Sequence, residues 1–195
     1  MKRLFVLGMT AFFLVSCGGG QAGKVTEEEF NEKKSQLAEQ PYTSGKGQGQ
    51  VTQKQQGRVT NDSTCSYLFT YENGEWSGSV SEGSGSATQF KTLYEHTMGN
   101  YLKAVDSIKA HMENAKTTFT ATEKEYSVTM TGKFDYAKAY PTVGAEGLLA
   151  ETFIVKWDEY GMPTRWELKM SGKLKYAGQS ISYEEYTLIT ATWIK

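Results

Sequence analysis

The stretch Tyr126-Ser-Val-Thr-Met130-Thr-Gly-Lys-Phe134-Asp-Tyr136 sets the fold, because every second residue in it is apolar or glycine. Side chains of a β-strand point alternately to opposite faces, so this pattern predicts a strand with one buried face and one solvated face. The same alternation recurs from residue 166 to residue 176, with Trp, Leu, Met, Gly, Leu and Tyr at the alternate positions. We therefore expect antiparallel strands that share one apolar face.

The two strands also match each other, residues 130–137 against residues 170–177, through a shared Met-x-Gly-Lys-x-x-Tyr-Ala pattern. Glycine on the apolar face permits either a bend in the sheet or the close approach of a helix or ligand. Methionine fills irregular gaps where Val or Ile would pack a simple sheet. The candidate ligand-binding residues are therefore Met130, Gly132, Met170 and Gly172.

Further strands flank this pair. Phe153, Val155 and Trp157 alternate with polar residues and predict a strand that turns at residues 158–163. A last strand, residues 181–194, is expected to return through residues 177–180. Its apolar phase shifts near Glu184-Glu185, which predicts a β-bulge there.

A hairpin is predicted at Asn73-Gly74, since this dipeptide favours a type I′ turn. The register would then place Tyr71 opposite Trp76 and Glu72 opposite Glu75. After Trp76, the Ser- and Gly-rich residues 77–86 are interpreted as a loop.

Residues 42–60 are polar, with glycine at positions 45, 47 and 49. In an extended chain all three glycines would face one side and leave a bare strip of backbone. An edge strand and a low-complexity loop remain alternatives for this segment.

Two helices are predicted. Thr26 and Glu29 form a capping-box pattern, with Val25 and Phe30 at the positions of a hydrophobic staple, and the short helix should end before Pro41. A long helix should begin near Ser86 and run through Met112, because apolar residues recur there at spacings of three and four. His96 and His111 would lie on it about 22 Å apart, too far to share a metal.

These elements predict an α+β fold, in which a curved antiparallel sheet resembling half a barrel packs on one long and one short helix. Residues 25–195 are long enough for one domain with a substantial core. The 21 Lys and Arg nearly balance the 22 Asp and Glu, so charge does not favour nucleic acid as a partner.

Catalytic and metal motifs are missing from the sequence. It has no G-x-S-x-G, no H-E-x-x-H, no cluster of Cys and His at ligand spacing and no dinucleotide-binding turn. The paired acids Asp158-Glu159 and Glu184-Glu185 point apart on a strand and are expected to be solvated. Cys65 is expected to be a buried, inert thiol. We therefore expect no enzyme activity, no cofactor and no metal site.

The N-terminus carries Lys2 and Arg3, followed by an apolar run at residues 4–15 that is too short to span a membrane. The site that follows, Leu14-Val15-Ser16-Cys17, resembles the lipobox of bacterial lipoproteins. The resemblance implies that residues 1–16 are a signal peptide and that Cys17 carries a diacylglycerol. Residues 17–24 would be the acylated cysteine and a flexible tether, and the protein would be anchored in the bacterial cell envelope through its acyl chains.

The order of the predicted elements also resembles that of half-barrel lipoprotein carriers and lipid-binding lipoproteins, over roughly residues 25 to 195. That resemblance implies a lipid or another amphiphile bound in a cavity between sheet and helix. The alternative is a non-enzymatic envelope interaction or structural protein with a fully packed core. A third reading is a binder of a polar ligand through Tyr and Trp.

Overall fold

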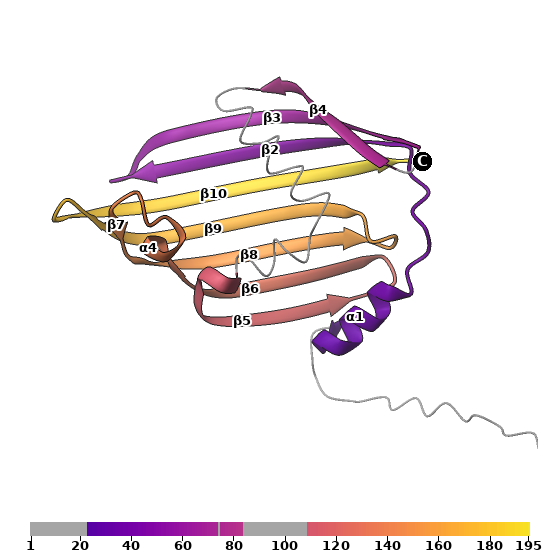
Figure 1. The fold of residues 1–195 in the computed structure, drawn as a ribbon, viewed down its shortest axis with the longest axis horizontal. Coiled ribbons are helices and arrows are strands. Elements are labelled where there is room, and N and C mark those ends of the chain that lie inside the picture. The colour runs from indigo at the N-terminus through magenta and orange to yellow at the C-terminus, as the bar shows by residue number, and fades with distance from the viewer. Residues whose placement is uncertain (1–22, 74, 84–108) are drawn as a thin grey trace, which may run out of the picture.

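The computed structural model describes residues 23–73, 75–83 and 109–195. Their strands form one antiparallel sheet in the order β1-β5-β6-β8-β9-β10-β2-β3-β4, with β7 paired to β9 (Figure 1). The two edge strands of this path do not pair with each other, so the sheet is open and is not a closed barrel. The predicted α+β class with a curved antiparallel sheet is confirmed.

The described residues form ten strands and two labelled helices. The strands are β1 Lys24–Val25, β2 Ser44–Gln55, β3 Arg58–Glu72, β4 Glu75–Gly83, β5 Met112–Ala121, β6 Glu125–Asp135, β7 Ala145–Glu146, β8 Leu148–Asp158, β9 Pro163–Tyr176 and β10 Gln179–Ile194, and the helices are α1 Glu27–Ser35 and α4 Tyr136–Ala139. No helix within the described ranges is long and apolar enough to cross a membrane.

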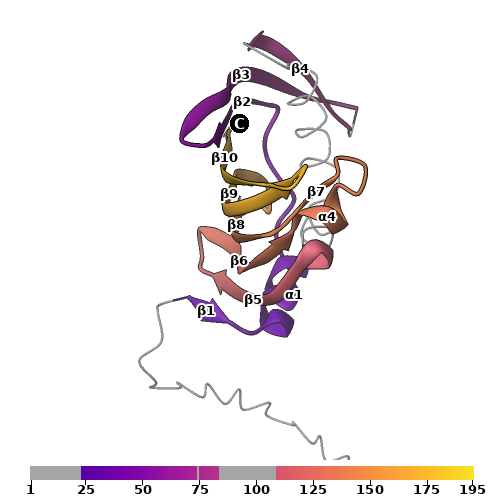
Figure 2. The same cartoon turned by 90° about the vertical axis from the view of Figure 1, so that its left-hand side faces the viewer.

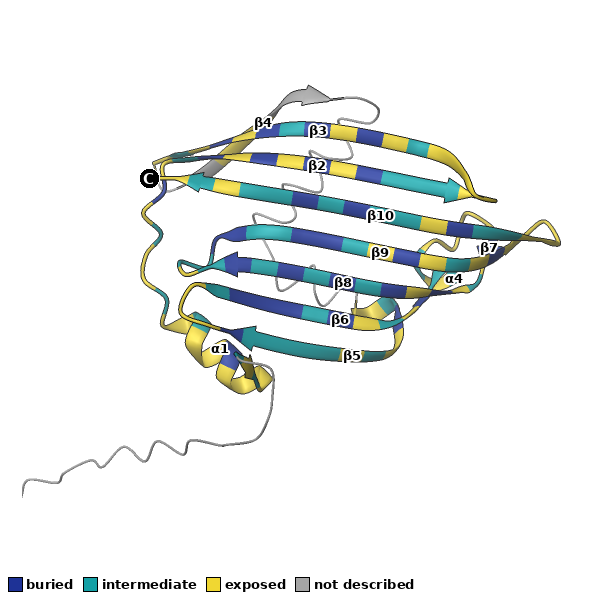
Figure 3. Cartoon of the chain, turned by 180° about the vertical axis from the view of Figure 1, so that it is seen from behind, coloured by how far each residue is buried: buried dark blue, intermediate teal, exposed yellow. Residues whose placement is uncertain are grey.

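Burial alternates along the strands and defines two faces of the sheet. The inner face contains Met130 of β6, Phe153 of β8, Trp166 of β9 and Ile189 of β10, all of them buried. The outer face carries the residues between them, and Figure 3 shows the resulting bands of buried and exposed residues along β2 and β3. Helices α1 and α4 lie on the same side of the sheet (Figure 2). The main core therefore lies on the inner face.

The polar, glycine-rich segment contains strand β2, so the prediction of a loop is wrong and the prediction of an edge strand needs correction. The segment is a strand, but it lies between β10 and β3 and is not at an edge. One glycine of the strip is covered by an aromatic ring from a neighbouring strand, since a Cβ added to Gly45 would lie 2.5 Å from the Trp193 ring. Trp193 in turn packs on Phe69, with ring centroids 5.1 Å apart. The missing side chain at Gly45 thus makes room for one of the protein's own rings.

The hairpin between β3 and β4 is confirmed, including the predicted register of Tyr71 with Trp76 and Glu72 with Glu75. Asn73 has a φ of 54°, as the turn requires. The loop predicted from residue 77 is wrong over its described part, because β4 continues to Gly83. Backbone pairing with β3 stabilises this strand despite its composition, and Gly78 leaves the space that the Tyr67 ring occupies.

The long helix predicted over residues 86–112 lies mostly outside the described residues, and so does His96. Residues 109–111 are helical, but Met112 begins β5. The helical assignment of Met112 is therefore wrong. Its side chain is buried, and it pairs with Phe134 across the sheet, which gives this residue a place in the core.

Two details of the later strands also differ from prediction. No bulge occurs at Glu184-Glu185, since the register of β10 is continuous against both β9 and β2. The apparent shift of the apolar pattern arises because Glu185 and Thr187 occupy inner-face positions between Tyr183 and Ile189. Tyr136, assigned to a strand, instead begins α4, where the Asp135 side chain accepts a hydrogen bond from the amide of Lys138.

Candidate functional site

Helix α1 is held at its start by the predicted capping box. The Thr26 amide donates to Glu29 Oε2 over 2.8 Å, and the Glu29 amide donates to Thr26 Oγ1 over 3.2 Å. The Thr26 hydroxyl also donates to Glu29 Oε2 over 3.0 Å, and the two bonds that Thr26 donates to this carboxylate lower the pKa of Glu29. The helix presents Phe30, which is only 1% exposed, to the inner face of the sheet.

Beside Phe30 lies a pocket of about 510 Å³ between α1 and the sheet, which we call the α1 pocket. Its floor is aromatic: the Phe30 ring centroid lies 5.3 Å from that of Phe119 and 6.0 Å from that of Trp157. This volume falls within the range of small-molecule sites, which are concave and mostly apolar. The pocket is lined by Glu27, Phe30, Asn31, Lys34, Ser35, Lys109, Thr117, Phe119, Val128, Met130 and Trp157.

The polar residues of the α1 pocket include two lysines, Lys34 and Lys109. Lys34 Nζ lies over the Trp157 ring, 4.2 Å from its centroid, in cation–π geometry. Burial lowers the pKa of Lys34, because a partly desolvated ammonium loses hydration. An anion in the pocket would therefore compensate a charge that is now only partly solvated.

The four residues predicted to bind a ligand do not meet in one cavity. Met130 is fully buried and lines the α1 pocket. Met170 is buried farther along the face, in a cluster with Phe134, Leu149, Leu174 and Tyr183.

The two glycines of that set are closely approached by other parts of the sheet. A Cβ on Gly132 would lie 3.0 Å from the Glu113 carbonyl oxygen, beside the irregular start of β5. A Cβ on Gly172 would lie 3.0 Å from Leu149 Cδ2 and 3.3 Å from its Cα. Only Met130 therefore lies at the α1 pocket, and the glycines accommodate neighbouring strands.

A second group of polar residues lies at the other end of the inner face, near α4. Glu185 Oε2 accepts hydrogen bonds from the Tyr183 hydroxyl and, over 2.9 Å, from Gln53 Nε2. The chain of donors continues across the sheet, since Asn61 Nδ2 donates to Gln53 Oε1 and Ser63 Oγ donates to Asn61 Oδ1. Glu185 is thus a well-bound acceptor, contrary to the expectation that both acids of its pair are solvated.

Glu151 lies two strands away from Glu185 on the same face and is only 4% exposed. Its Oε2 atom is buried and has no hydrogen-bond partner among the described residues. Burial, together with the negative charge of Glu185, raises the pKa of the Glu151 carboxyl to about 7.

Three tyrosine rings lie near these acids. The Tyr136 ring of α4 packs edge-on against Tyr183, with centroids 6.0 Å apart. It is tilted against the Tyr140 ring, with centroids 4.9 Å apart. Burial and the nearby Glu185 charge raise the pKa of both Tyr136 and Tyr140, and Glu151 also contributes to the shift at Tyr140. We call Tyr136, Tyr140, Glu151, Tyr183 and Glu185 the Tyr–Glu cluster.

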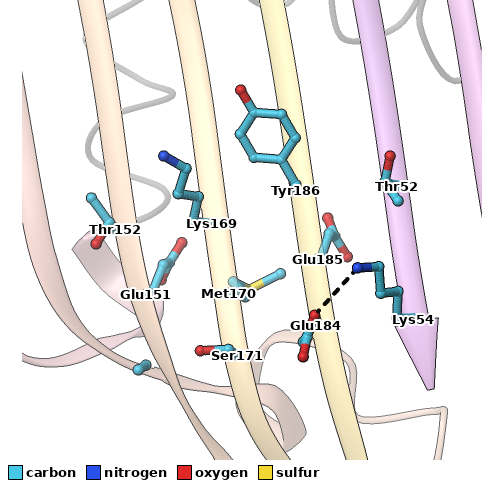
Figure 4. Close-up of a pocket in the computed structure, with 11 residues that line it drawn as sticks. Thr52, Lys54, Glu151, Thr152, Lys169, Met170, Ser171, Glu184, Glu185 and Tyr186 are labelled. Atoms are coloured by element: carbon cyan, nitrogen blue, oxygen red, sulfur yellow. Dashed lines mark ion pairs between the residues drawn. The ribbon is translucent and has the colours of Figure 1, made fainter. Parts of the chain in front are cut away.

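The outer face carries a groove of about 470 Å³ across β8, β9, β10 and β2 (Figure 4). Its side chains are mainly polar and include an ion pair between Lys54 and Glu184 at 3.8 Å. Lys169 lies over the Tyr186 ring at 5.5 Å from its centroid. Both lysines and Glu184 are substantially exposed, so this groove has the character of a solvated sheet surface.

Other chemistry has little support in the described part of the chain. Within those ranges no three His, Cys, Asp or Glu residues group at metal-binding distance. Cys65 is buried as predicted, and burial raises the pKa of its thiol to about 11, which disfavours the reactive thiolate. Cys17 lies outside the described residues.

Sequence reasoning missed Glu151 and Glu185 as a pair, although one signal was present. Each acid occupies an apolar phase position of its strand, between Leu149 and Phe153 or between Tyr183 and Thr187. An ionisable residue in the buried phase of a strand indicates a special environment. Comparison of the sequence with protein-family models and with curated proteins found no match, so the two sites are interpreted on their own geometry.

Proposed function

We propose that this protein is a lipid-anchored lipoprotein of the bacterial cell envelope whose folded part binds an anionic amphiphile in the α1 pocket. The single observation that carries the binding proposal is the 510 Å³ pocket, with its aromatic floor and its two lysines. The proposal for the anchor rests on the lipobox-like Leu14-Val15-Ser16-Cys17.

The pocket's lining supports an amphiphile because it combines apolar and cationic groups. A hydrocarbon chain in the pocket would remove its own surface and that of the partly exposed Phe119 from water, at about 25 cal/mol for each Å². The buried rings of Phe30 and Trp157 lie beside that surface. Lys34 and Lys109 offer positive charge to a carboxylate or phosphate headgroup. A fatty acid or a single-chain phospholipid has both parts.

Methionine adds adaptability to this site. Met130 lies on the pocket floor, opposite Thr117 of β5. Its flexible thioether side chain can repack around chains of different length. The site is therefore suited to a class of amphiphiles rather than to one molecule.

The alternative, an envelope interaction protein with a packed core, has support elsewhere on the inner face. Aromatic rings cover Gly45, and neighbouring strands closely approach Gly132 and Gly172. Ligand uptake confined to the α1 pocket would agree both with the pocket and with the close packing at these glycines. A complete lack of uptake would favour the interaction protein.

Uptake of a fluorescent fatty acid tests the binding proposal. The full chain carrying Cys17→Ser, prepared without detergent, would be titrated with the probe. Thr117→Trp should fill the pocket and reduce uptake at least about tenfold, which corresponds to roughly 1.4 kcal/mol. The matched control is Thr118→Trp, the same change on the outer face, which should leave uptake unchanged.

The lysines provide a second test with the same protein. Lys34→Glu should weaken binding of the fatty acid much more than binding of the corresponding fatty alcohol, because only the acid carries a negative charge. Equal uptake by the Thr117→Trp and Thr118→Trp variants would place the probe elsewhere. No uptake by the parent chain would favour the interaction protein.

The anchor is tested by cell fractionation. Cys17→Ser removes the thiol that would be acylated, so the variant should remain unprocessed or be released from the membrane. Retention of the variant in the membrane fraction at the normal mature size would contradict the assignment.

A further inference from the structure

The two acids of the Tyr–Glu cluster lie in one row across the inner face. Glu151 of β8 pairs with Met170 of β9, and Met170 pairs with Glu185 of β10. Neighbouring strands are about 4.8 Å apart, so the two Cα atoms are separated by roughly 10 Å. The row continues to Gln53 of β2, which donates to Glu185.

The described strands supply no positive charge to this end of the inner face. The inner-face positions of β6, β8, β9 and β10 contain no Lys or Arg, as their alternation shows. Neither Glu151 nor Glu185 forms an ion pair with a residue in the described ranges. By contrast Glu167, an equally buried acid on the outer face, is paired with both Arg165 and Lys169. The fold therefore supplies cations to one buried acid and not to the other.

The two inner acids also differ in their hydrogen bonds. The acceptor Glu185 has Tyr183 and Gln53 as donors, whereas Glu151 Oε2 is buried with none among the described residues. An unmade hydrogen bond at a buried polar atom costs about 1–3 kcal/mol. A ligand that donates a hydrogen bond there would recover this free energy.

Aromatic rings complete the arrangement. Tyr136, Tyr140 and Tyr183 form a chain of ring contacts, and Tyr140 is 46% exposed, so the cluster reaches the surface at that ring. Faces of aromatic rings attract cations, and anionic groups beside such rings strengthen that attraction. Met170, between the two acids, offers apolar surface to an alkyl group.

We propose that the Tyr–Glu cluster is a binding site for a primary alkylammonium group, whose N–H donors contact Glu151 and whose charge is balanced by Glu151 and Glu185. The ligand needs N–H groups because the unpartnered Glu151 oxygen requires a donor, which a quaternary ammonium lacks. A divalent metal fits less well, because no third ligating side chain accompanies the two acids in the described chain. This site is separate from the α1 pocket and does not depend on its function.

Hexylammonium chloride is a suitable probe, with hexanol and hexanoate as molecules of the same chain length. Each would be titrated by calorimetry into the full chain carrying Cys17→Ser at pH 8. Hexylammonium should bind at least about tenfold more tightly than hexanol, and hexanoate should bind no better than hexanol at this site. Tetramethylammonium should bind more weakly than hexylammonium.

The decisive variant is Glu151→Gln, which keeps the side-chain volume and removes the charge. It should lose about tenfold or more in affinity for hexylammonium. Its matched control is Glu184→Gln, which removes the same charge from the exposed outer-face neighbour of Glu185. Thermal unfolding of both variants verifies that they fold.

Three results would overturn the proposal. They are equal binding of hexylammonium by the Glu151→Gln and Glu184→Gln variants, equal binding of the ammonium and the alcohol by the parent chain, and no binding of hexylammonium by the parent chain at all. Conversely, the site is supported if only Glu151→Gln loses affinity and the α1-pocket variant Thr117→Trp retains it.

Discussion

The two ends of the inner face are built on the same strands and have opposite character. Near α1, strands β6 and β8 present Met130 and Trp157 to a pocket with two lysines. Near α4, strand β8 presents Glu151 to a group of tyrosines and a second acid. Alternation along a strand thus decides which face of the sheet a residue joins. An acidic residue at one of the otherwise apolar inner-face positions then gives that end of the face a different chemistry.

Between these two ends, the side chains of the inner face are closely packed. Phe153 is fully buried, and its ring lies edge-on to Trp166 with centroids 5.2 Å apart. This packing separates the α1 pocket from the Tyr–Glu cluster along strand β8. The two ends can then respond independently to substitution, and the following changes test that separation.

The largest effect is expected from Phe153→Ala, which removes the ring between the two ends. Loss of a fully buried phenylalanine should lower the free energy of unfolding by about 3–5 kcal/mol. Denaturant unfolding measures this, with Thr152→Ala on the outer face as the control, expected to change little. A small loss for Phe153→Ala would mean that the middle of the face is not packed and that both ends belong to one cavity.

A smaller loss is expected from Gly172→Leu. The new side chain would start 3.3 Å from the Leu149 Cα, so it should overpack the face near α4 and cost about 1–3 kcal/mol. Ser171→Leu, one residue away and exposed, is the control. If Gly172→Leu leaves the free energy of unfolding unchanged, the sheet has space at this position. That result would support the ligand cavity predicted from the sequence around Met170 and Gly172.

The sequence was a good guide to the fold wherever local physics decides structure. Period-two alternation predicted β6, β8 and β9, Thr26 and Glu29 predicted the start of α1, and Asn73 predicted the hairpin register. It failed where partners distant in the sequence decide. Backbone pairing with β3 extends β4 through a Ser- and Gly-rich segment, and β10 places β2 inside the sheet.

The candidate sites were harder to predict for the same reason. Met130 and Met170 have the same local pattern, yet one faces the α1 pocket and the other packs near α4. Glu151 and Glu185 are more than thirty residues apart in the chain, and only the order of β8, β9 and β10 brings them into one row. A single sequence contains no direct record of that order.

The Tyr–Glu cluster should make the stability of the fold decrease as pH rises, and the α1 pocket should not have this effect. The folded-state pKa of Glu151 is about 7, above its ordinary value of 4.5, so the folded protein retains a proton that the unfolded chain releases. The contribution of Glu151 to stability is therefore fully present below about pH 4.5, falls as pH rises towards 7 and is constant above it.

Unfolding midpoints measured from pH 4 to pH 8 test this dependence. Relative to the parent chain, Glu151→Gln should gain stability progressively over that interval, because glutamine has no proton to lose. Glu184→Gln, with an exposed carboxyl, should not show the same trend. A pH-independent difference between Glu151→Gln and the parent would show that Glu151 titrates normally.

The smallest effect concerns the cap that positions α1 over its pocket. Thr26→Ala removes the side-chain oxygen that accepts from the Glu29 amide and should cost about 1 kcal/mol, the usual value of such a cap. Thr26→Ser retains the oxygen and should cost less. Since Phe30 and Lys34 reach the α1 pocket only through this helix, Thr26→Ala should also weaken fatty-acid uptake, while hexylammonium binding at the Tyr–Glu cluster stays unchanged. Equal weakening at both sites would show that the two ends of the face are coupled, because a local change at α1 would then have altered the sheet as a whole.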